Sequence, residues 1–228
     1  IFHMGVPVSG KNVFPSNIQG LPTWYEIRCN ASGHICRTED FDLVVAMNAQ
    51  TYACDLAEVR SGGCFLYDSS WPLDGKMVRD DVTFIGIPFS RMCNDTFEGS
   101  RTRILMKNIS YVGALAALLA VDVDVIKSQL HEAFAAKQHL MDANMTAISL
   151  GIDYVTDNYD CPLPFRLEAM DPDTGNIMIN GNTGAAMGCL FAGATVGAWY
   201  PITPSTSLMD SFSFFCDTYR IDPETGEK

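Results

Sequence analysis

Hydrophobic and polar positions along the chain follow two different periods, and short polar or glycine-rich segments separate the elements that they predict. Tyr25–Arg28 alternates apolar and polar side chains, which is typical of a half-exposed strand. Nearly continuous apolar runs predict further strands at 41–47, buried on both faces of a parallel sheet, at 64–67 and at 82–87. A helix is expected over 49–60. This order of elements predicts βαβ units with right-handed crossovers.

Punctuating residues and a helical period complete this first unit. Ser61-Gly62-Gly63 is expected to stop the first helix, and Pro88 to close the last strand. Residues 101–119 then carry apolar side chains close to a 3.6-residue period, which predicts an amphipathic helix. Asp124 is a suitable N-cap for a helix over 125–136, and a further helix is expected over 140–154.

A change in composition near Asp160 predicts a domain boundary. Prolines at 162 and 164 break any helix, and a turn is expected over 171–175, so 161–176 is predicted to be a linker. A second βαβ unit is then predicted, with a strand at 176–179, a turn at 180–182, a helix over 183–195, a strand ending at Tyr200-Pro201, and a last helix capped by Ser205 or Thr206. The predicted domains are 1–160 and 177–228.

Composition and charge narrow the class of protein. Of the 228 residues 47% are hydrophobic and 18% are charged, which excludes a disordered chain and a coiled coil. The formal charge is −12 and no basic cluster occurs, so nucleic acid is not expected as a partner. The first residues lack the features of a secretion signal, and the apolar run 112–121 is too short to span a bilayer. The sequence predicts a cytoplasmic protein without a membrane segment.

The eight cysteines do not have the spacing of a metal site. The closest pair, Cys29 and Cys36, is seven residues apart, and no Cys-x-x-Cys motif occurs. Cys54 and Cys189 lie in apolar segments, where a buried reduced thiol behaves as a small hydrophobic group. His131 and His139 lack an accompanying carboxylate pattern. No metal ligands are therefore predicted in this chain.

The most informative segment is Tyr200-Pro201-Ile202-Thr203-Pro204-Ser205. Its prolines restrict the backbone on both sides of Thr203 and remove two backbone donors, so a stiff loop is expected. One interpretation is a rigid turn followed by capping hydroxyl groups. The other is a ligand site, because a carboxylate could meet the Thr203 hydroxyl and the free N–H groups of the following helix.

The same segment, preceded by Gly181-Asn182-Thr183-Gly184 and Gly193, closely resembles the start of the alpha domain of 2-oxoacid:ferredoxin (acceptor) oxidoreductases. The resemblance implies that Thr203 contacts the oxoacid carboxylate or its adduct with thiamine diphosphate. It also implies that Tyr200, Pro201 and Ile202 form the wall beside that cofactor.

The upstream region resembles the gamma domain of the same family, on four segments taken in order: 10–16, 24–28, 43–48 and 62–68. The implied fold class is α/β, with a Rossmann-like gamma domain followed by the start of a pyrimidine-type α/β domain of a thiamine-diphosphate enzyme.

Two departures from the family pattern concern the ends and one loop. Gln19-Gly20-Leu21 replaces the Arg-Gly-Gly of many gamma domains. Residues 1–5 resemble the helix that follows the family's first strand and glycine-rich turn. The family's activating glutamate is expected shortly beyond Lys228, so the sequence is expected to be a fragment.

The resemblance implies a subunit of an enzyme that oxidatively decarboxylates a 2-oxoacid with coenzyme A to acyl-CoA and CO2, and reduces ferredoxin. It also implies a partner beta subunit that holds most of the thiamine diphosphate, its Mg²⁺ and a [4Fe-4S] cluster. Two alternatives stay open from the residues themselves: a non-catalytic α/β assembly or binding module, and a Rossmann-like nucleotide enzyme with a glycine-rich loop ahead of Ile1.

Overall fold

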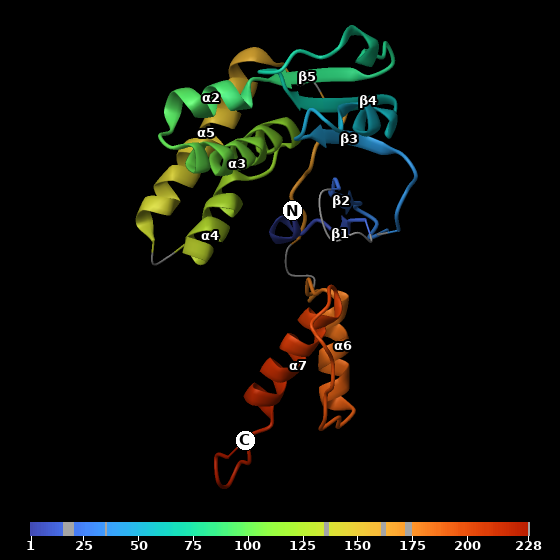
Figure 1. Ribbon diagram of the computed structural model, residues 1–228, viewed down its shortest axis with the longest axis vertical. Coiled ribbons are helices and arrows are strands. Elements are labelled where there is room, and N and C mark those ends of the chain that lie inside the picture. Colours follow the sequence, from blue (N-terminus) through green and yellow to red (C-terminus); the bar gives the residue numbers. More distant parts are fainter. Residues whose placement is uncertain (16–20, 35, 135–136, 161–162, 172–174, 228) are drawn as a thin grey trace. The chain divides into compact units, whose positions relative to one another are not determined.

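The computed structural model describes residues 1–15, 21–34, 36–134, 137–160, 163–171 and 175–227 (Figure 1). They belong to two compact units, Ile1–Thr174 and Gly175–Lys228. Some sequence features lie outside the described residues: Gln19-Gly20, Cys161-Pro162, the middle of the expected turn at 172–174, and the expected helix end at 135–136.

The first unit is built on a parallel sheet of three strands in the order β3-β4-β5. They are β3 (Phe41–Ala46), β4 (Val59–Asp68) and β5 (Thr83–Ile87), which confirms the three apolar runs as strands. Because β4 pairs on both edges, its residues 64–66 are fully buried. The prediction that the 41–47 run is buried on both faces is wrong, since β3 is an outer strand of this sheet and only Ala46 in it is buried.

The first predicted helix is shorter than expected. It forms only over α1 (Tyr52–Ala57), and β4 begins at Val59. The Arg79 guanidinium donates to the carbonyl oxygens of Leu56 and Val59, both at 2.9 Å, and so satisfies backbone acceptors where the helix gives way to the strand. The predicted helix stop at 61–63 is part of β4.

Those residues form an irregularity in the sheet. On β3 the paired residues Phe41 and Leu43 are two apart, whereas their β4 partners Val59 and Cys64 are five apart, so β4 carries extra residues as a bulge. Gly62 has φ +76°, a left-handed conformation that favours glycine, and its N–H donates to the Asp81 carbonyl oxygen at 2.7 Å.

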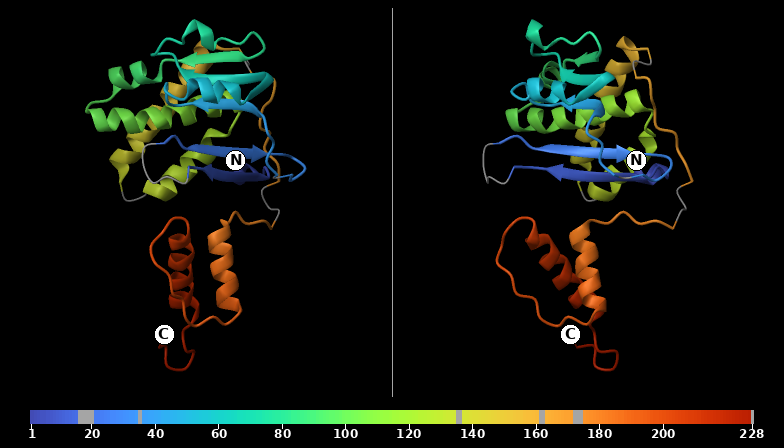
Figure 2. Two further views of the ribbon diagram at one scale, coloured as in Figure 1. Left: turned by 45° about the vertical axis from the view of Figure 1, so that its right-hand side comes forward. Right: turned by 90° about the vertical axis from the view of Figure 1, so that its right-hand side faces the viewer.

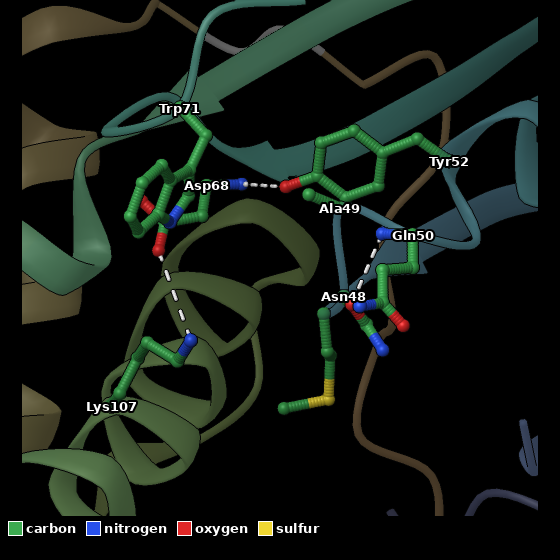
Figure 3. Close-up of a pocket in the computed structure, with 8 residues that line it drawn as sticks. Asn48, Ala49, Gln50, Tyr52, Asp68, Trp71 and Lys107 are labelled. Carbon is green, nitrogen blue, oxygen red and sulfur yellow. Dashed lines mark hydrogen bonds and ion pairs between the residues drawn. The ribbon is translucent and has the colours of Figure 1, made fainter. Parts of the chain in front are cut away.

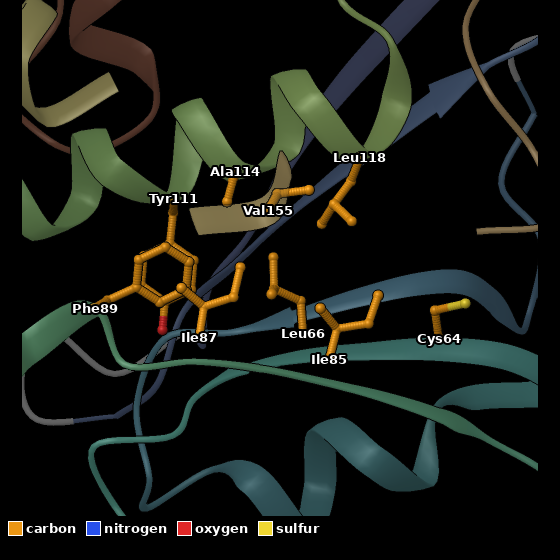
Figure 4. Close-up of a cluster of buried hydrophobic side chains, with 9 residues drawn as sticks. All are labelled: Cys64, Leu66, Ile85, Ile87, Phe89, Tyr111, Ala114, Leu118 and Val155. Atoms are coloured by element: carbon orange, nitrogen blue, oxygen red, sulfur yellow. The ribbon is translucent and has the colours of Figure 1, made fainter. Parts of the chain in front are cut away.

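Helices contribute side chains to the core beside the sheet: α2 (Phe89–Thr96), α3 (Ser100–Leu119) and α5 (Gln138–Asn158). Helix α4 (Val123–Phe134) packs on α5 and buries none of its residues fully. Side chains from β4 and β5 meet α3 and α5 in the main hydrophobic core, drawn in Figure 4. The predicted helices over 101–119 and 140–154 are confirmed. The sequence prediction did not include helix α2. Pro88 was interpreted only as the end of a strand, whereas it also stands at the N-cap of this helix.

Helix α4 begins two residues earlier than predicted. Asp122, and not Asp124, supplies the capping oxygen, because Asp122 Oδ1 accepts from the Asp124 N–H at 2.8 Å. The helix accordingly begins at Val123, so Asp124 lies within its first turn.

A separate antiparallel hairpin pairs β1 (Val8–Val13) with β2 (Trp24–Cys29), as Figure 2 shows. It confirms the alternating strand at 25–28, while β1 was not predicted. The Trp24 indole N–H donates to Asp55 Oδ1 at 2.8 Å and ties the hairpin to α1. Where the resemblance implied a helix, residues 1–5 contain a 3-10 turn, η1 (Phe2–Met4).

The expected linker makes contacts with the first unit. Leu163 packs against the main core, the Leu167 N–H donates to the Leu119 carbonyl oxygen, and the Met170 N–H donates to the Met4 carbonyl oxygen, both at 2.8 Å. The division into a gamma domain 1–160 and an alpha domain from 177 stays a prediction.

The second unit consists of α6 (Gly181–Phe191) and α7 (Ser205–Tyr219), packed around Ala186, Phe212 and Phe215. The predicted βαβ is wrong here: within the described residues of this unit, 176–180 and 194–204 do not form strands. A strand requires a paired neighbour for its backbone groups, and apolar character without such a neighbour does not make one. Helix α6 also starts before the predicted Thr183, because Asn180 Oδ1 accepts the Thr183 N–H at 2.8 Å.

Candidate functional site

The predicted site residues Tyr200, Pro201, Ile202 and Thr203 lie together in the loop that leads into α7. All four are exposed, with Tyr200 at 72% and Ile202 at 52% of their full accessible area. Within the part of the chain that the structure describes, the Thr203 hydroxyl has no hydrogen-bond partner. It is therefore free to bind a ligand.

One side of this loop is fixed by hydroxyl groups of α7. The Ile202 N–H donates to Thr206 Oγ1 at 3.1 Å, and Ser205 Oγ donates to the Ile202 carbonyl oxygen at 2.9 Å. The Thr206 N–H also donates to that oxygen, at 3.2 Å. The predicted capping role of Ser205 and Thr206 is wrong, because both hydroxyls bind the backbone of Ile202, while Pro204 stands at the N-cap without a side-chain cap.

The other side of the loop is fixed at the Pro204 carbonyl oxygen. Asn182 Nδ2 donates to it at 2.7 Å and also donates to Ser207 Oγ at 2.7 Å. Ser207 Oγ in turn donates to the Pro204 oxygen at 3.1 Å. Thr203 thus lies between two residues whose backbones are held, with its own side chain exposed.

This arrangement is chemically suited to a carboxylate. The N-terminal turn of a helix presents backbone N–H groups and the positive end of its dipole, and α7 carries no side-chain cap there. A hydroxyl donor beside such a turn adds a charge-assisted hydrogen bond. The apolar Tyr200 and Ile202 side chains offer surface for an uncharged part of a ligand.

The first unit contains a cleft that sequence reasoning missed (Figure 3). Its volume is about 330 Å³, and its lining residues are Met47, Asn48, Ala49, Gln50, Tyr52, Asp68, Trp71 and Lys107. It lies just past the carboxyl ends of β3 and β4, which is where ligands bind in open α/β sheets. The polar residues that follow each predicted strand, Asn48 and Asp68, were the signal that could have indicated it.

Asp68 organises one wall of the cleft. Its side chain is buried, with Oδ1 accepting from the Ser70 N–H at 3.0 Å and Oδ2 accepting from the Ser90 N–H at 3.1 Å and from the Ser90 hydroxyl. The Lys107 ammonium lies 4.0 Å from Oδ2. The carboxylate therefore joins the end of β4 to the start of α2 and holds a cation beside the cleft.

Burial favours the neutral form of several groups in this unit. Burial raises the pKa of Tyr52 to about 12, although its hydroxyl accepts a hydrogen bond from the Asp68 N–H at 3.2 Å. Burial also raises the pKa of the Cys64 and Cys93 thiols. These thiols are packed in the core and are not activated as nucleophiles.

The prediction of buried cysteine thiols is wrong at two positions. Cys54 and Cys189 are exposed, although each lies in an apolar sequence segment. Both are on helices, where every third or fourth residue shares a face, so an apolar neighbourhood in sequence does not place a residue in the core.

Two negative findings apply to the described residues alone. They contain no group of three or more His, Cys, Asp or Glu side chains that could hold a metal ion. Among the described helices, none combines the length and the apolar character needed to cross a membrane.

Comparisons with known proteins identify relatives of this chain. Residues 1–154 match the family described as pyruvate ferredoxin/flavodoxin oxidoreductase. The 2-oxoacid:ferredoxin oxidoreductase 2 alpha subunit of Aeropyrum pernix is 24% identical over 89% of this chain. The chain spans 37% of the length of that relative.

Two solved structures share the fold. A 2-oxoglutarate:ferredoxin oxidoreductase from Magnetococcus marinus, with 2-oxoglutarate, coenzyme A and succinyl-CoA bound, matches the whole chain with a TM-score of 0.82 at 22% identity. The match covers 38% of that chain. The gamma subunit of a keto/oxoacid ferredoxin oxidoreductase from Geobacter sulfurreducens covers 67% of this chain and 82% of its own, with a TM-score of 0.51 at 15% identity. The mixed α/β fold class is confirmed.

Proposed function

The chain belongs to the pyruvate ferredoxin/flavodoxin oxidoreductase family, and on that premise we propose that it is part of a 2-oxoacid:ferredoxin oxidoreductase. This enzyme would decarboxylate a 2-oxoacid oxidatively, transfer the acyl group to coenzyme A, and pass the released electrons to ferredoxin. The observation that carries the proposal is the exposed Thr203 hydroxyl on a loop fixed on both sides at the start of α7.

In this proposal Thr203 donates a hydrogen bond to the carboxylate of the 2-oxoacid, and the positive end of the α7 dipole adds to its binding. Both interactions orient the substrate before its carboxylate leaves as CO2. Because Ile202 and Pro204 are held by hydrogen bonds, the hydroxyl is positioned in advance of binding.

The proposed cofactor is thiamine diphosphate, which stabilises the carbanion formed on decarboxylation when it is bound. The exposed Tyr200, Pro201 and Ile202 fit the apolar side of such a group, since they present an aromatic ring and two aliphatic surfaces. The described residues offer no cluster of acidic groups for Mg²⁺. On the family resemblance, we assign most of the diphosphate binding, its Mg²⁺ and a [4Fe-4S] cluster to a partner beta subunit.

Two names among the relatives support the partners in this proposal. The Aeropyrum pernix relative is named as an alpha subunit, which implies further subunits in that enzyme. The Magnetococcus marinus structure contains coenzyme A and succinyl-CoA. By analogy, this chain would act with a beta subunit, use coenzyme A as co-substrate and deliver electrons to ferredoxin.

The test uses the complete subunit purified with its partner. We expect ferredoxin reduction to depend on both a 2-oxoacid and coenzyme A. Thr203→Ala should lower kcat/KM for the 2-oxoacid by about 10- to 100-fold, because a hydrogen bond to a charged group contributes about 1.5–3 kcal/mol. Thr203→Ser is the matched control, since it keeps the hydroxyl and should retain most of the activity.

Two results would count against the proposal. A wild-type complex that reduces no acceptor with pyruvate, 2-oxoglutarate or branched 2-oxoacids would favour the non-catalytic assembly module. Full kcat/KM in Thr203→Ala would remove the substrate role of Thr203 while leaving the enzymatic activity in place.

A further inference from the structure

Asn182 connects the first turn of α6 to the loop that carries Thr203. Its side-chain amide makes two hydrogen bonds of 2.7 Å, one to the Pro204 carbonyl oxygen and one to Ser207 Oγ. Among the described residues of α6, no other side chain hydrogen-bonds to the loop 200–204. An amide nitrogen has two N–H donors, and both are used here.

The remaining contacts of the loop come from α7 itself. Ser205 and Thr206 hold Ile202, and Ser207 adds a second donor to the Pro204 oxygen. These bonds are local in sequence, so they fix the loop only relative to its own helix. Asn182 is 22 residues from Pro204 and fixes the loop relative to α6.

Thr203 immediately precedes Pro204, whose carbonyl oxygen accepts the hydrogen bond from Asn182. Rotation of the peptide groups around Pro204 would move Thr203 and its hydroxyl together. Holding this oxygen in place therefore restricts the directions in which the exposed hydroxyl can point, and positioning of that kind affects reactivity strongly.

We propose that Asn182 is a positioning residue of the 2-oxoacid site, which acts through Thr203 and does not touch the substrate. The inference rests on the proposed function, because it requires that Thr203 bind the 2-oxoacid. Its physical basis is the double hydrogen bond that joins α6 to the backbone next to Thr203.

The decisive variants are Asn182→Asp and Asn182→Ala, in the complete subunit with its partner. Aspartate has nearly the same shape but cannot donate to the Pro204 oxygen when ionised, whereas alanine removes the group entirely. We expect both to raise KM for the 2-oxoacid by about tenfold, as expected for the loss of one hydrogen bond worth about 1.4 kcal/mol. KM for coenzyme A should stay unchanged.

The matched control is Asn180→Ala on the same helix. Asn180 caps α6 by accepting the Thr183 N–H at 2.8 Å but makes no hydrogen bond to the loop in the described structure. Its loss should lower helix stability, with KM for the 2-oxoacid unchanged. If the role of Asn182 were only structural, its variants would likewise lower stability and leave KM unchanged. Comparing the Asn182 variants with Asn180→Ala therefore distinguishes positioning from stability.

A double-mutant cycle with Thr203→Ala completes the test. If Asn182 acts through Thr203, Asn182→Asp should cause no further loss in the Thr203→Ala background. Additive losses, or an unchanged KM in both Asn182 variants, would overturn the inference while the proposed function stands. If Thr203→Ala itself has no effect, the proposed substrate site fails and the inference falls with it.

Discussion

Single buried polar side chains in the first unit hydrogen-bond to neighbouring elements and so link them. Asp68 accepts three hydrogen bonds from Ser70 and Ser90, and Tyr52 accepts one from the Asp68 N–H. Asp55 accepts from Trp24 and from the Thr51 hydroxyl, at 2.8 and 2.6 Å. Because a buried polar group without a partner is costly, each of these residues specifies which elements lie together.

Tyr52 predicts how stability depends on alkaline pH. Its pKa is raised by burial to about 12, whereas a tyrosine in the unfolded chain ionises near pH 10. Between pH 10 and about 12 the unfolded chain therefore loses a proton that the folded chain retains. The free energy of unfolding should fall over this range, and the contribution of Tyr52 should be fully present below pH 10.

The measurement is urea unfolding at several pH values, comparing the wild type with Tyr52→Phe. The variant should lose stability less steeply with pH, by at most about 1.4 kcal/mol per pH unit for one proton. Tyr25→Phe, which removes a phenol at an exposed position, is the matched control variant. Equal slopes in the wild type and Tyr52→Phe would show that the Tyr52 phenol ionises alike in both states.

The packing of α3 on α5 is decided by two glycines. A Cβ atom on Gly113 would overlap the Ile148 carbonyl oxygen, and one on Gly151 would overlap the Ser110 carbonyl oxygen. The two helices therefore approach to backbone contact along this face. The core residues Ala114 and Ile148 are fully or almost fully buried beside the crossing.

Replacing either glycine should separate the helices. We expect Gly113→Ala and Gly151→Ala each to lower the free energy of unfolding by about 3 kcal/mol, since the neighbouring atoms are backbone and cannot move aside as a side chain can. Val112→Ala, at an exposed position beside Gly113, should change stability by less than about 0.5 kcal/mol. Chemical denaturation monitored by circular dichroism measures all three, and a neutral effect of both glycine variants would contradict the close crossing.

The two units of the molecule differ in how much apolar surface they bury. The first has a central core of sheet and helix side chains, whereas the second buries chiefly Ala186, Phe212 and Phe215. Large apolar side chains in the second unit are exposed, among them Phe191 and Val196 at 83% each. Hydrophobic burial is the main stabilising contribution in small folds, so the second unit should open more readily.

Hydrogen exchange of the complete chain tests this difference. We expect the amides of β4 and α3 to exchange at least about tenfold more slowly than those of α6 and α7, which corresponds to a difference of about 1.4 kcal/mol in opening free energy. Peptides over the exposed segment 36–40, which forms no helix or strand, serve as an internal reference for fast exchange within the first unit. Comparable protection of all four elements would mean that the small core of the second unit stabilises it as much as the larger core stabilises the first unit.

Elements with a strong local signal could be predicted from the sequence. The strands predicted at 41–47, 64–67 and 82–87 form as β3, β4 and β5, and the 3.6-residue period of 101–119 forms helix α3. The resemblance carried by Tyr200–Ser205 pointed to the family that the comparison over residues 1–154 shows.

Features that depend on partners distant in sequence could not be predicted from local patterns. Residues 176–179 have strand-like composition but no strand forms there among the described residues, since a strand is made by its neighbour. Ser205 and Thr206 bind Ile202 where local rules predict a helix cap. The cleft beside Asp68 and the bond from Asn182 to Pro204 join residues far apart along the chain, and no local pattern contains such contacts.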